Sequence, residues 1–229
     1  MSGVIEDAYP LAPGQGGMLF HGIAGRAGGA YVVQIVLDLS GRPDPVREAA
    51  AWDALVARHD VLRTAFVWKD RPSPLQVVGR RATLAQRVRD LDGMPGPQQE
   101  ARIAAFLAED RAAGFDLSRA PLMRVSRFAL APDRHRIVVS FHHAVLDGWS
   151  VPVLLRDWVA LYAGQSLPPA ARFRDHVARS LGRDRAAARE FWRAELAGPA
   201  AARWPLARPS AAPAEARGTA QAPAASPAH

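Results

Sequence analysis

Two adjacent histidines, His142 and His143, lie in a short segment that continues to an aspartate, a glycine, a tryptophan and a serine. Histidine ordinarily changes its charge near neutral pH, so an imidazole in a cleft can take a proton from an amine or alcohol that attacks a carbonyl carbon. Neighbouring side chains of an extended backbone point in opposite directions. We therefore expect one ring to face the core and the other to face a cleft, where it would transfer a proton.

Asp147 and Gly148 follow the histidines at a fixed spacing. Asp147 has a short side chain, so we expect it to brace the turn through a charged partner. Gly148 permits a close approach of the backbone or an unusual dihedral angle. Two histidines at a strand end are more often a matter of packing, but the Asp-Gly-Trp-Ser sequence beside them favours a chemical role. A serine hydrolase is not indicated, because the sequence has no Gly-x-Ser-x-Gly elbow.

The segment lies where a predicted strand ends and a predicted helix begins. Residues 136–141 follow residues 122–130 after a short turn, and both stretches have strand composition, which predicts a hairpin. Apolar side chains at helical spacing predict a helix over residues 149–162. A junction of this kind holds side chains at a rigid edge and leaves free N–H donors at the start of the helix.

Hydrophobic periodicity and turn residues predict the remaining elements. Further strands are expected at residues 31–39, 64–68, 75–78 and 84–91. Further helices are expected at residues 11–23, 45–59, 97–113, 170–181 and 184–197. Asp44 is expected to cap the second of these helices, with Pro45 in its first position. The predicted fold class is therefore α+β, with helices packed on one mixed, mostly antiparallel sheet.

The composition excludes several classes of site. Because the chain has no cysteine, disulfides, thiolate nucleophiles and cysteine-ligated metal sites are excluded. The formal net charge is +7, but Lys69 is the only lysine and the arginines are scattered, which does not indicate a nucleic-acid surface. No apolar run is long enough to cross a bilayer, and the first residues do not form a secretory signal. We expect a cytoplasmic protein without a nucleic-acid, membrane or metal ligand.

Four segments, in the correct order, resemble the condensation domains of nonribosomal peptide synthetases. Residues 142–148 match the HHxxxDG signature, which the wider chloramphenicol acetyltransferase-like fold shares. Residues 58–66 are similar to the family's RHxxLRTxF motif. Residues 9–21 and 115–124 resemble the family's opening motif and the segment that leads into the strand before the histidines. The resemblance covers only the N-terminal lobe of such a domain.

The resemblance implies a role for each matching residue. His143 would act on the acceptor amine, as a general base or by positioning it, and His142 would be structural. Asp147 would pair with Arg63, because a carboxylate at a buried turn needs a charged partner. Gly148 would offer its backbone near the reacting carbonyl group.

The resemblance also implies a reaction and partners. Trp149 and Ser150 would begin the helix, with Ser150 as a hydrogen-bonding group and not as a nucleophile. The expected reaction is amide-bond-forming acyl transfer from a carrier-protein-bound thioester to an amine acceptor in nonribosomal peptide synthesis. No cofactor would bind directly, because the substrates are carried on phosphopantetheine arms of peptidyl and aminoacyl carrier proteins. A second condensation lobe or adjacent synthetase domains are further expected partners.

The expected organisation has three parts. Residues 5–181 would form the N-terminal lobe, and residues 182–197 the helix that normally begins the second lobe. Residues 198–229, rich in alanine and proline, would be a disordered tail, so the domain would be truncated. Two alternatives remain at this point: a non-catalytic remnant or carrier-protein-binding module, and a related epimerization or O-acyltransferase domain.

Overall fold

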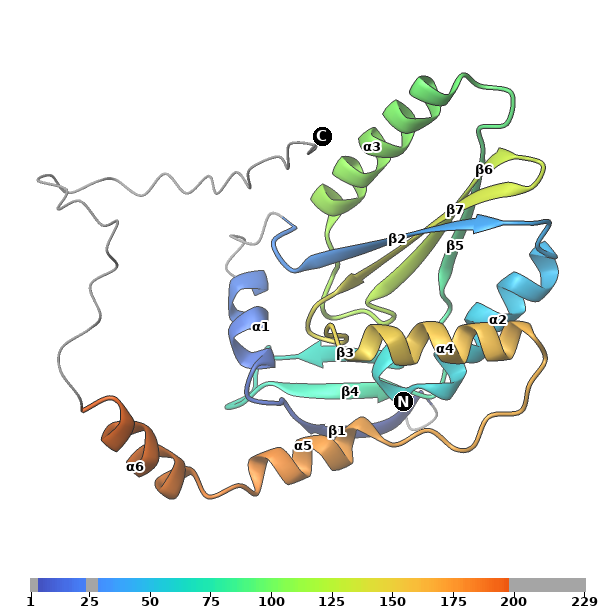
Figure 1. Cartoon of the computed structure of the whole chain (residues 1–229). Coiled ribbons are helices and arrows are strands. Elements are labelled where there is room, and N and C mark those ends of the chain that lie inside the picture. The colour runs from blue at the N-terminus through green and yellow to red at the C-terminus, as the bar shows by residue number, and fades with distance from the viewer. Residues whose placement is uncertain (1–3, 24–28, 198–229) are drawn as a thin grey trace, which may run out of the picture. The chain divides into compact units, whose positions relative to one another are not determined.

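The computed structural model describes residues 4–23 and 29–197 (Figure 1). The chain divides into two compact units, with the boundary between Arg183 and Asp184. The first unit contains all the described strands and the helices α1 to α5, and the second contains helix α6. The tail predicted at residues 198–229 lies outside the described residues.

A four-stranded sheet carries the predicted hairpin at its centre. Its strand order is β2-β7-β6-β5, in which only β5 and β6 run parallel. The strands are β2 (Val32–Ser40), β5 (Ala85–Asp90), β6 (Met123–Ala131) and β7 (Arg134–His142). Both faces are covered: Val138 of β7 packs in a cluster with α3 (Gly96–Ala113), and Ile137, Val139 and Phe141 pack in the main core. The alternation of side chains along β7 therefore divides them between two layers.

A second, three-stranded sheet was not expected as a separate layer. It has the order β1-β4-β3 and is wholly antiparallel. Its strands are β1 (Ile5–Pro10), β3 (Thr64–Val67) and β4 (Leu75–Gly79). The prediction of a single sheet is therefore wrong, although the α+β class is confirmed. Strand β1 escaped prediction because it is an edge strand with Tyr9 as its only buried residue.

Helices α2 (Pro45–Arg58) and α4 (Ser150–Tyr162) lie side by side on the main core (Figure 1). As predicted, Asp44 caps α2, because its carboxylate accepts hydrogen bonds from the main-chain N–H groups of Val46 and Arg47. The rings of Trp52 and Trp158 stack between the two helices, with 4.7 Å between their centroids. This contact fixes α4, which begins directly after the histidine segment.

Three further α-helices and one short 3₁₀ helix complete the described residues. Helix α1 (Gln15–Ile23) follows β1, and a short 3₁₀ helix, η1 (Asp60–Arg63), joins α2 to β3. Helix α5 (Phe173–Leu181) packs on the three-stranded sheet through Val177, which contacts Tyr9 and Val78. Helix α6 (Arg185–Glu195) is capped by Asp184. No helix among the residues with described placement has the length and apolar character that a membrane span requires.

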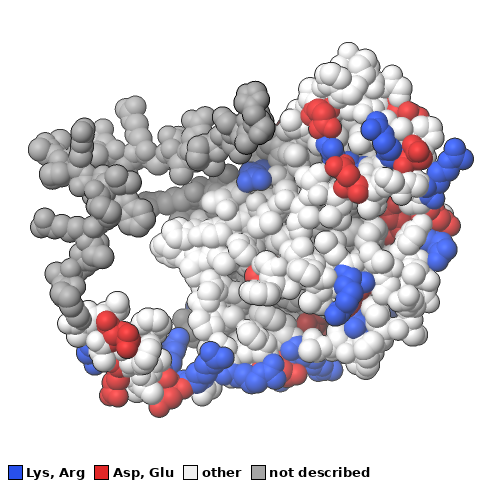
Figure 2. Space-filling model, in the orientation of Figure 1, with Lys and Arg blue, Asp and Glu red and all other residues white. Residues whose placement is uncertain are grey.

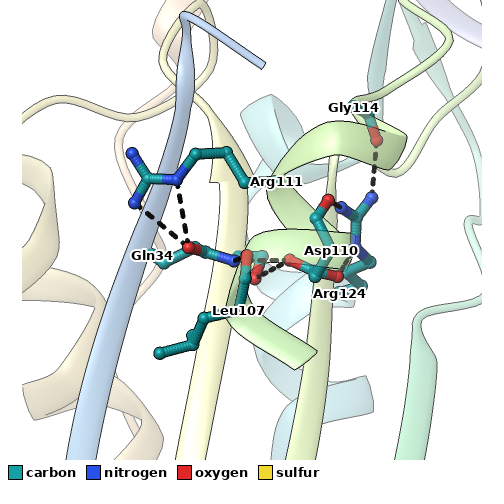
Figure 3. A network of polar contacts seen from close by, with 7 residues as sticks. Gln34, Leu107, Asp110, Arg111, Gly114 and Arg124 are labelled. Carbon is teal, nitrogen blue, oxygen red and sulfur yellow. Dashed lines mark hydrogen bonds and ion pairs between the residues drawn. The ribbon is translucent and has the colours of Figure 1, made fainter. Parts of the chain in front are cut away.

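A buried carboxylate ties α3 to the four-stranded sheet (Figure 3). Asp110 of α3 accepts hydrogen bonds from the guanidinium of Arg124, the amide of Gln34 and the hydroxyl of Ser140. Burial raises the pKa of Asp110, but these three donors together outweigh burial and hold the pKa below its ordinary value. The network therefore holds an ionised carboxylate between one helix and strands β2, β6 and β7.

Charged side chains of both signs lie together at the margins of the face drawn in Figure 2, around a centre with few charges. Ion pairs account for several of the arginines on the described surface. Arg136 contacts both Asp38 and Glu100, and Arg174 contacts Asp7. The charges of these arginines are thus balanced locally by acidic side chains.

Candidate active site

The histidine segment begins at the end of β7, between two strands that hold its backbone. The N–H of His142 donates to the carbonyl oxygen of Leu122 at 2.9 Å, and the N–H of His143 donates to the carbonyl oxygen of Tyr31 at 2.8 Å. The chain then turns, because the N–H of Val145 donates back to the carbonyl oxygen of His142 at 3.1 Å. The turn directs the two rings into different surroundings.

His142 is the buried histidine of the pair, with 5% of its surface exposed. Its Nδ1 atom accepts a hydrogen bond from the main-chain N–H of Ala144 at 3.2 Å, so Nδ1 carries no proton. Burial, with a smaller contribution from the neighbouring His143, lowers the pKa of His142 to about 4. The ring is therefore neutral at pH 7.

His143 is half-buried, and its ring has one defined partner. The Nδ1 atom lies 2.8 Å from the carbonyl oxygen of Leu146. A carbonyl oxygen only accepts hydrogen bonds, so the neutral ring must carry its proton on Nδ1. The lone pair then lies on Nε2, which is the atom that can accept a proton from a reacting group.

Asp147 holds the start of α4. It is exposed, and its Oδ1 atom accepts hydrogen bonds from the main-chain N–H of Ser150 at 2.9 Å and from the Ser150 hydroxyl at 2.6 Å. The Ser150 hydroxyl is the largest of several influences that keep the pKa of Asp147 below its ordinary value, with the main-chain N–H of Trp149 among the smaller ones. The ionised carboxylate thus occupies free N–H donors at a helix N-terminus.

The predicted ion pair between Arg63 and Asp147 is wrong. The Arg63 side chain, 8% exposed, pairs with the carboxylate of Glu6 on β1, with 2.6 Å between Nη1 and Oε2. It also donates to the carbonyl oxygens of Val56 and Gly79. Arg63 therefore fastens the end of α2 to the three-stranded sheet, while Ser150 meets the hydrogen-bonding needs of Asp147.

Gly148 and Trp149 lie in open surroundings. Gly148 does not have a positive φ, and a Cβ at this position would meet no described atom within 4 Å. Of the two possibilities that glycine permits here, the structure thus has no positive φ, and free space adjoins the backbone. The Trp149 side chain is 89% exposed and directly precedes the first residue of α4.

Two cavities adjoin the histidine segment. The first, of about 480 Å³, is lined by His142 and Lys69 among others. The second, of about 520 Å³, is lined by Asp147, Trp149 and Ser150 together with residues of α4 and α5. Both are large enough for a small-molecule ligand. Among the residues with described placement, no group of three or more potential ligands could hold a metal ion.

Sequence reasoning missed Asp157. Its contacts explain the arginine and the histidine that begin the segment 58–66. Asp157 of α4 has 1% of its side chain exposed, and its Oδ2 atom contacts Arg58 at 2.9 Å and His59 at 3.0 Å. These contacts connect the end of α2 to α4. A signal was available, because Asp157 directly precedes Trp158 on the apolar face of an amphipathic helix, where a carboxylate requires a partner.

Sequence reasoning also missed the contact that Gln15 makes with the histidine segment. Its amide donates a hydrogen bond to the carbonyl oxygen of Ala144 at 2.9 Å. Gln15 lies within the segment 9–21, whose likeness to a family motif carried no information on this contact.

Comparisons with known proteins find relatives of this chain. A family model described as "Condensation domain" matches residues 5–222. One of the subunits of linear gramicidin synthase from Brevibacillus parabrevis is 40% identical over 203 residues, which cover 86% of this chain and 3% of that protein. Bacitracin synthase 1 of Bacillus licheniformis is 34% identical over 200 residues, which cover 85% of this chain and 4% of that protein.

A solved structure shows the same fold. The first condensation domain of the calcium-dependent antibiotic synthetase, in complex with a substrate analogue, matches with a TM-score of 0.71 at 22% identity. The match covers 85% of this chain and 50% of that one. This chain therefore spans about half of the solved domain and a small part of the two synthases.

Proposed function

This chain belongs to the condensation domain family, and we propose that it contributes the catalytic histidine of an amide-forming acyl transfer. The donor is an acyl thioester and the acceptor is an amine. As the amine nitrogen bonds to the thioester carbon, Nε2 of His143 takes a proton from that nitrogen. The carbon–sulfur bond then breaks, and the sulfur leaves as a thiol after receiving a proton. Atoms and charge balance without a metal or an oxidant.

The observation that carries this proposal is the hydrogen bond from His143 Nδ1 to Leu146. It holds the ring in the tautomer that has its lone pair on Nε2, and the ring is half-buried at the end of a rigid strand. A base must present a free lone pair in a fixed direction before the amine arrives. His143 meets this requirement, whereas Nδ1 of His142 is already occupied by the N–H of Ala144.

His142 and Asp147 support the base in different ways. A neutral His142 places no positive charge beside the proton that His143 receives. Asp147 keeps the turn and the start of α4 together through Ser150. Gly148 leaves free backbone space in which the reacting carbonyl group can approach.

The substrates arrive on the phosphopantetheine arms of carrier proteins in this proposal. The two cavities support it, because they adjoin the same short segment, one at His142 and the other at Asp147. Lys69 in the first cavity offers a positive charge to the phosphate of an arm. Tethering both reactants replaces a random encounter with a guided one, which lowers the entropic cost of the reaction.

The test requires the half of a condensation domain that this chain does not span. The purified chain is mixed with a separately expressed second half and with acyl-loaded and aminoacyl-loaded carrier proteins, and the amide product is measured by mass spectrometry. His143→Ala should lower the rate by about a hundredfold to ten-thousandfold, the usual contribution of a general base. His21→Ala, which removes an exposed histidine of α1, should leave the rate unchanged.

The outcomes separate the candidate functions. Product that depends on His143 supports amide formation. An inverted stereocentre without a new amide would indicate epimerization instead. Carrier binding without either product, under every combination of substrates, would indicate a non-catalytic carrier-binding module and would overturn the proposal.

A further inference from the structure

Two buried glutamines form a reciprocal amide pair beneath the histidine segment. Gln15 is the first residue of α1, and Gln76 lies in β4, the central strand of the three-stranded sheet. Gln76 Nε2 donates to Gln15 Oε1 at 3.0 Å, and Gln15 Nε2 donates to Gln76 Oε1 at 3.2 Å. Both side chains are buried, so neither amide can exchange these partners for bulk water.

The surroundings fix the orientation of the Gln15 amide. The main-chain N–H of Ala12 can only donate, and it lies 2.7 Å from Gln15 Oε1. The carbonyl oxygen of Ala144 can only accept, and it lies 2.9 Å from Gln15 Nε2. With Gln76 as a further partner of both atoms, every donor and acceptor position of the Gln15 amide is used. If the amide were flipped, its NH₂ group would face two donors and its oxygen would face two acceptors.

Gln76 anchors this amide to the sheet. Its Nε2 atom also donates to the carbonyl oxygen of Pro10 at 2.9 Å, at the end of β1. The pair therefore links three parts of the chain, namely the three-stranded sheet, the start of α1 and the turn that follows the two histidines. Gln76 is 61 positions from Gln15 along the chain, and Ala144 is 129 positions from it.

The hydrogen bond from Gln15 to Ala144 meets the turn between His143 and Leu146, whose carbonyl group orients the His143 ring. Ala144 is the next residue after His143, and Leu146, which accepts the hydrogen bond from His143 Nδ1, is two residues further. Ala144 and Leu146 are both buried, so a carbonyl group that loses its donor here has to rotate or move to find another. Such a movement changes the direction of the Leu146 carbonyl group and hence the tautomer of His143.

We propose that Gln15 is a positioning residue that, through Ala144, holds His143 in its Nδ1–H tautomer, with Gln76 fixing the amide of Gln15. Gln15 has no contact with the reacting atoms in this proposal. The consequence for catalysis rests on the proposed function of His143 as a base, whereas the consequence for the tautomer does not.

The test measures the tautomer of His143 directly in the full chain. The protein is labelled with ¹⁵N-histidine, and the Nδ1 and Nε2 signals of His143 are assigned from their loss in His143→Ala. Above the pH at which the ring is protonated, the wild-type chain should show mainly the Nδ1–H form. Gln15→Met removes the donor to Ala144 at similar length, and the Nε2–H form should become at least as populated as the Nδ1–H form.

The sequence offers a matched control in Gln99. Gln99 is also buried and helical, and its Nε2 atom donates to two main-chain carbonyl oxygens, those of Leu91 at 2.9 Å and Leu130 at 2.8 Å. Gln99→Met removes comparable hydrogen bonds beside another part of the core. It should lower the stability without changing the tautomer of His143. An equal change in both variants would show a general loosening and would overturn the proposal.

A second variant, Gln15→Glu, keeps the proposal testable if Gln15→Met folds poorly. Gln15→Glu keeps the length and both acceptor contacts but cannot donate to Ala144 when it is ionised, so it should shift the tautomer in the same direction. If folded Gln15→Met retains the wild-type ratio of tautomers, or if Gln15→Glu retains it when ionised, the proposal is overturned. In the reconstituted carrier assay, Gln15→Met should lower kcat by about tenfold to a hundredfold, as misplacement of a catalytic group does, with KM for the carriers unchanged.

The two proposals fail in different ways. A tautomer that depends on Gln15, without any amide product in the reconstituted assay, would refute the function of His143 and leave the positioning role intact. Amide formation that depends on His143, with a tautomer indifferent to Gln15, would refute the positioning role alone.

Discussion

Glu6 and Arg63 form an ion pair, with 2.6 Å between Oε2 and Nη1, and this pair connects β1 to the residue that directly precedes β3. The family resemblance predicts Asp147 as the partner of Arg63 instead. In the structure the guanidinium is almost covered and has carbonyl oxygens as its remaining partners. Arg63 thus stabilises the three-stranded sheet, and its effect on the histidine segment is indirect.

A double-mutant cycle distinguishes these two partners. Glu6→Gln with Arg63→Met should show a coupling free energy of about 1 kcal/mol, because the two side chains share a partly buried contact. Asp147→Asn with Arg63→Met should show additive losses, within about 0.5 kcal/mol. The measurement is the free energy of unfolding in urea for each single and double variant. A larger coupling for the Asp147 pair than for the Glu6 pair would contradict the observed contacts.

His142 should make the stability of the fold depend on pH in the weakly acidic range. Its pKa is lowered to about 4 from an ordinary value of 6.5, mainly by burial, so the unfolded chain binds a proton at a higher pH than the folded chain does. Stability from this group is complete above pH 6.5 and is lost as the pH falls towards 4, by about 3 kcal/mol in total. His142→Asn keeps an acceptor for the N–H of Ala144 but does not titrate.

Urea unfolding of the wild type and His142→Asn from about pH 7.5 to about pH 4 measures this contribution. The difference in free energy between the two proteins should change steadily across that range in favour of the variant at low pH. Parallel curves would mean that His142 binds its proton equally well in the folded and unfolded chains.

Asp157 should contribute strongly to the stability of the fold. Its carboxylate is 1% exposed and contacts Arg58 and His59, so Asp157→Asn leaves a partly buried guanidinium without its anion. The expected loss is about 3 kcal/mol, as for other buried pairs from which one partner is removed. Asp38→Asn is the matched control, because Asp38 also pairs with an arginine but is 66% exposed, and it should cost less than about 1 kcal/mol. Thermal unfolding of both variants checks the difference, and equal losses would contradict it.

Asp110 should add a dependence on pH at the acidic end of the range. Its pKa lies below the ordinary value, because the donors Arg124, Ser140 and Gln34 together outweigh burial, which acts in the opposite direction and is the largest single influence. The stability from this carboxylate is therefore present above the ordinary pKa and is lost as the pH falls through the lowered one. Asp110→Asn should be less stable than the wild type at about pH 7, with a smaller difference at about pH 3.

Asp133→Asn is the control for Asp110, because Asp133 lies exposed in the turn between β6 and β7. Its effect on the free energy of unfolding should be small at both pH values. A difference between the wild type and Asp110→Asn that stays constant across the whole range of pH would show that Asp110 is not preferentially ionised in the fold.

Local patterns predicted most of the helices and strands. The hairpin of β6 and β7, the cap of α2 and the helix after the histidines follow from alternation, capping residues and helical spacing, and the structure has all three. Strand β1 carries no such pattern, since its residues Ile-Glu-Asp-Ala-Tyr-Pro do not alternate and it lies at an edge. Because β1 was missed, neither the second sheet nor the role of Glu6 as the partner of Arg63 could be foreseen.

The site was predictable in its position but not in its contacts. The alternation of side chains along a strand correctly predicted that the two histidines would differ in burial. The Nδ1 contact of His143 depends on the course of a turn, and the contact between Gln15 and Ala144 joins residues 129 positions apart. Hydrogen bonds of this kind leave no periodic trace in a sequence, because a single polar side chain can meet any nearby backbone group.

The pairing of β2 with β7 has a consequence for how the chain folds. Asp38 and Arg136 are partners in this register although 98 positions separate them, and Tyr31 and His143 meet just beyond its end. Strand pairing at such a distance costs much loop-closure entropy before any contact repays it, which slows folding in proteins of high contact order. We expect the histidine turn to be among the last parts to acquire protection from hydrogen exchange, well after the local β6–β7 hairpin.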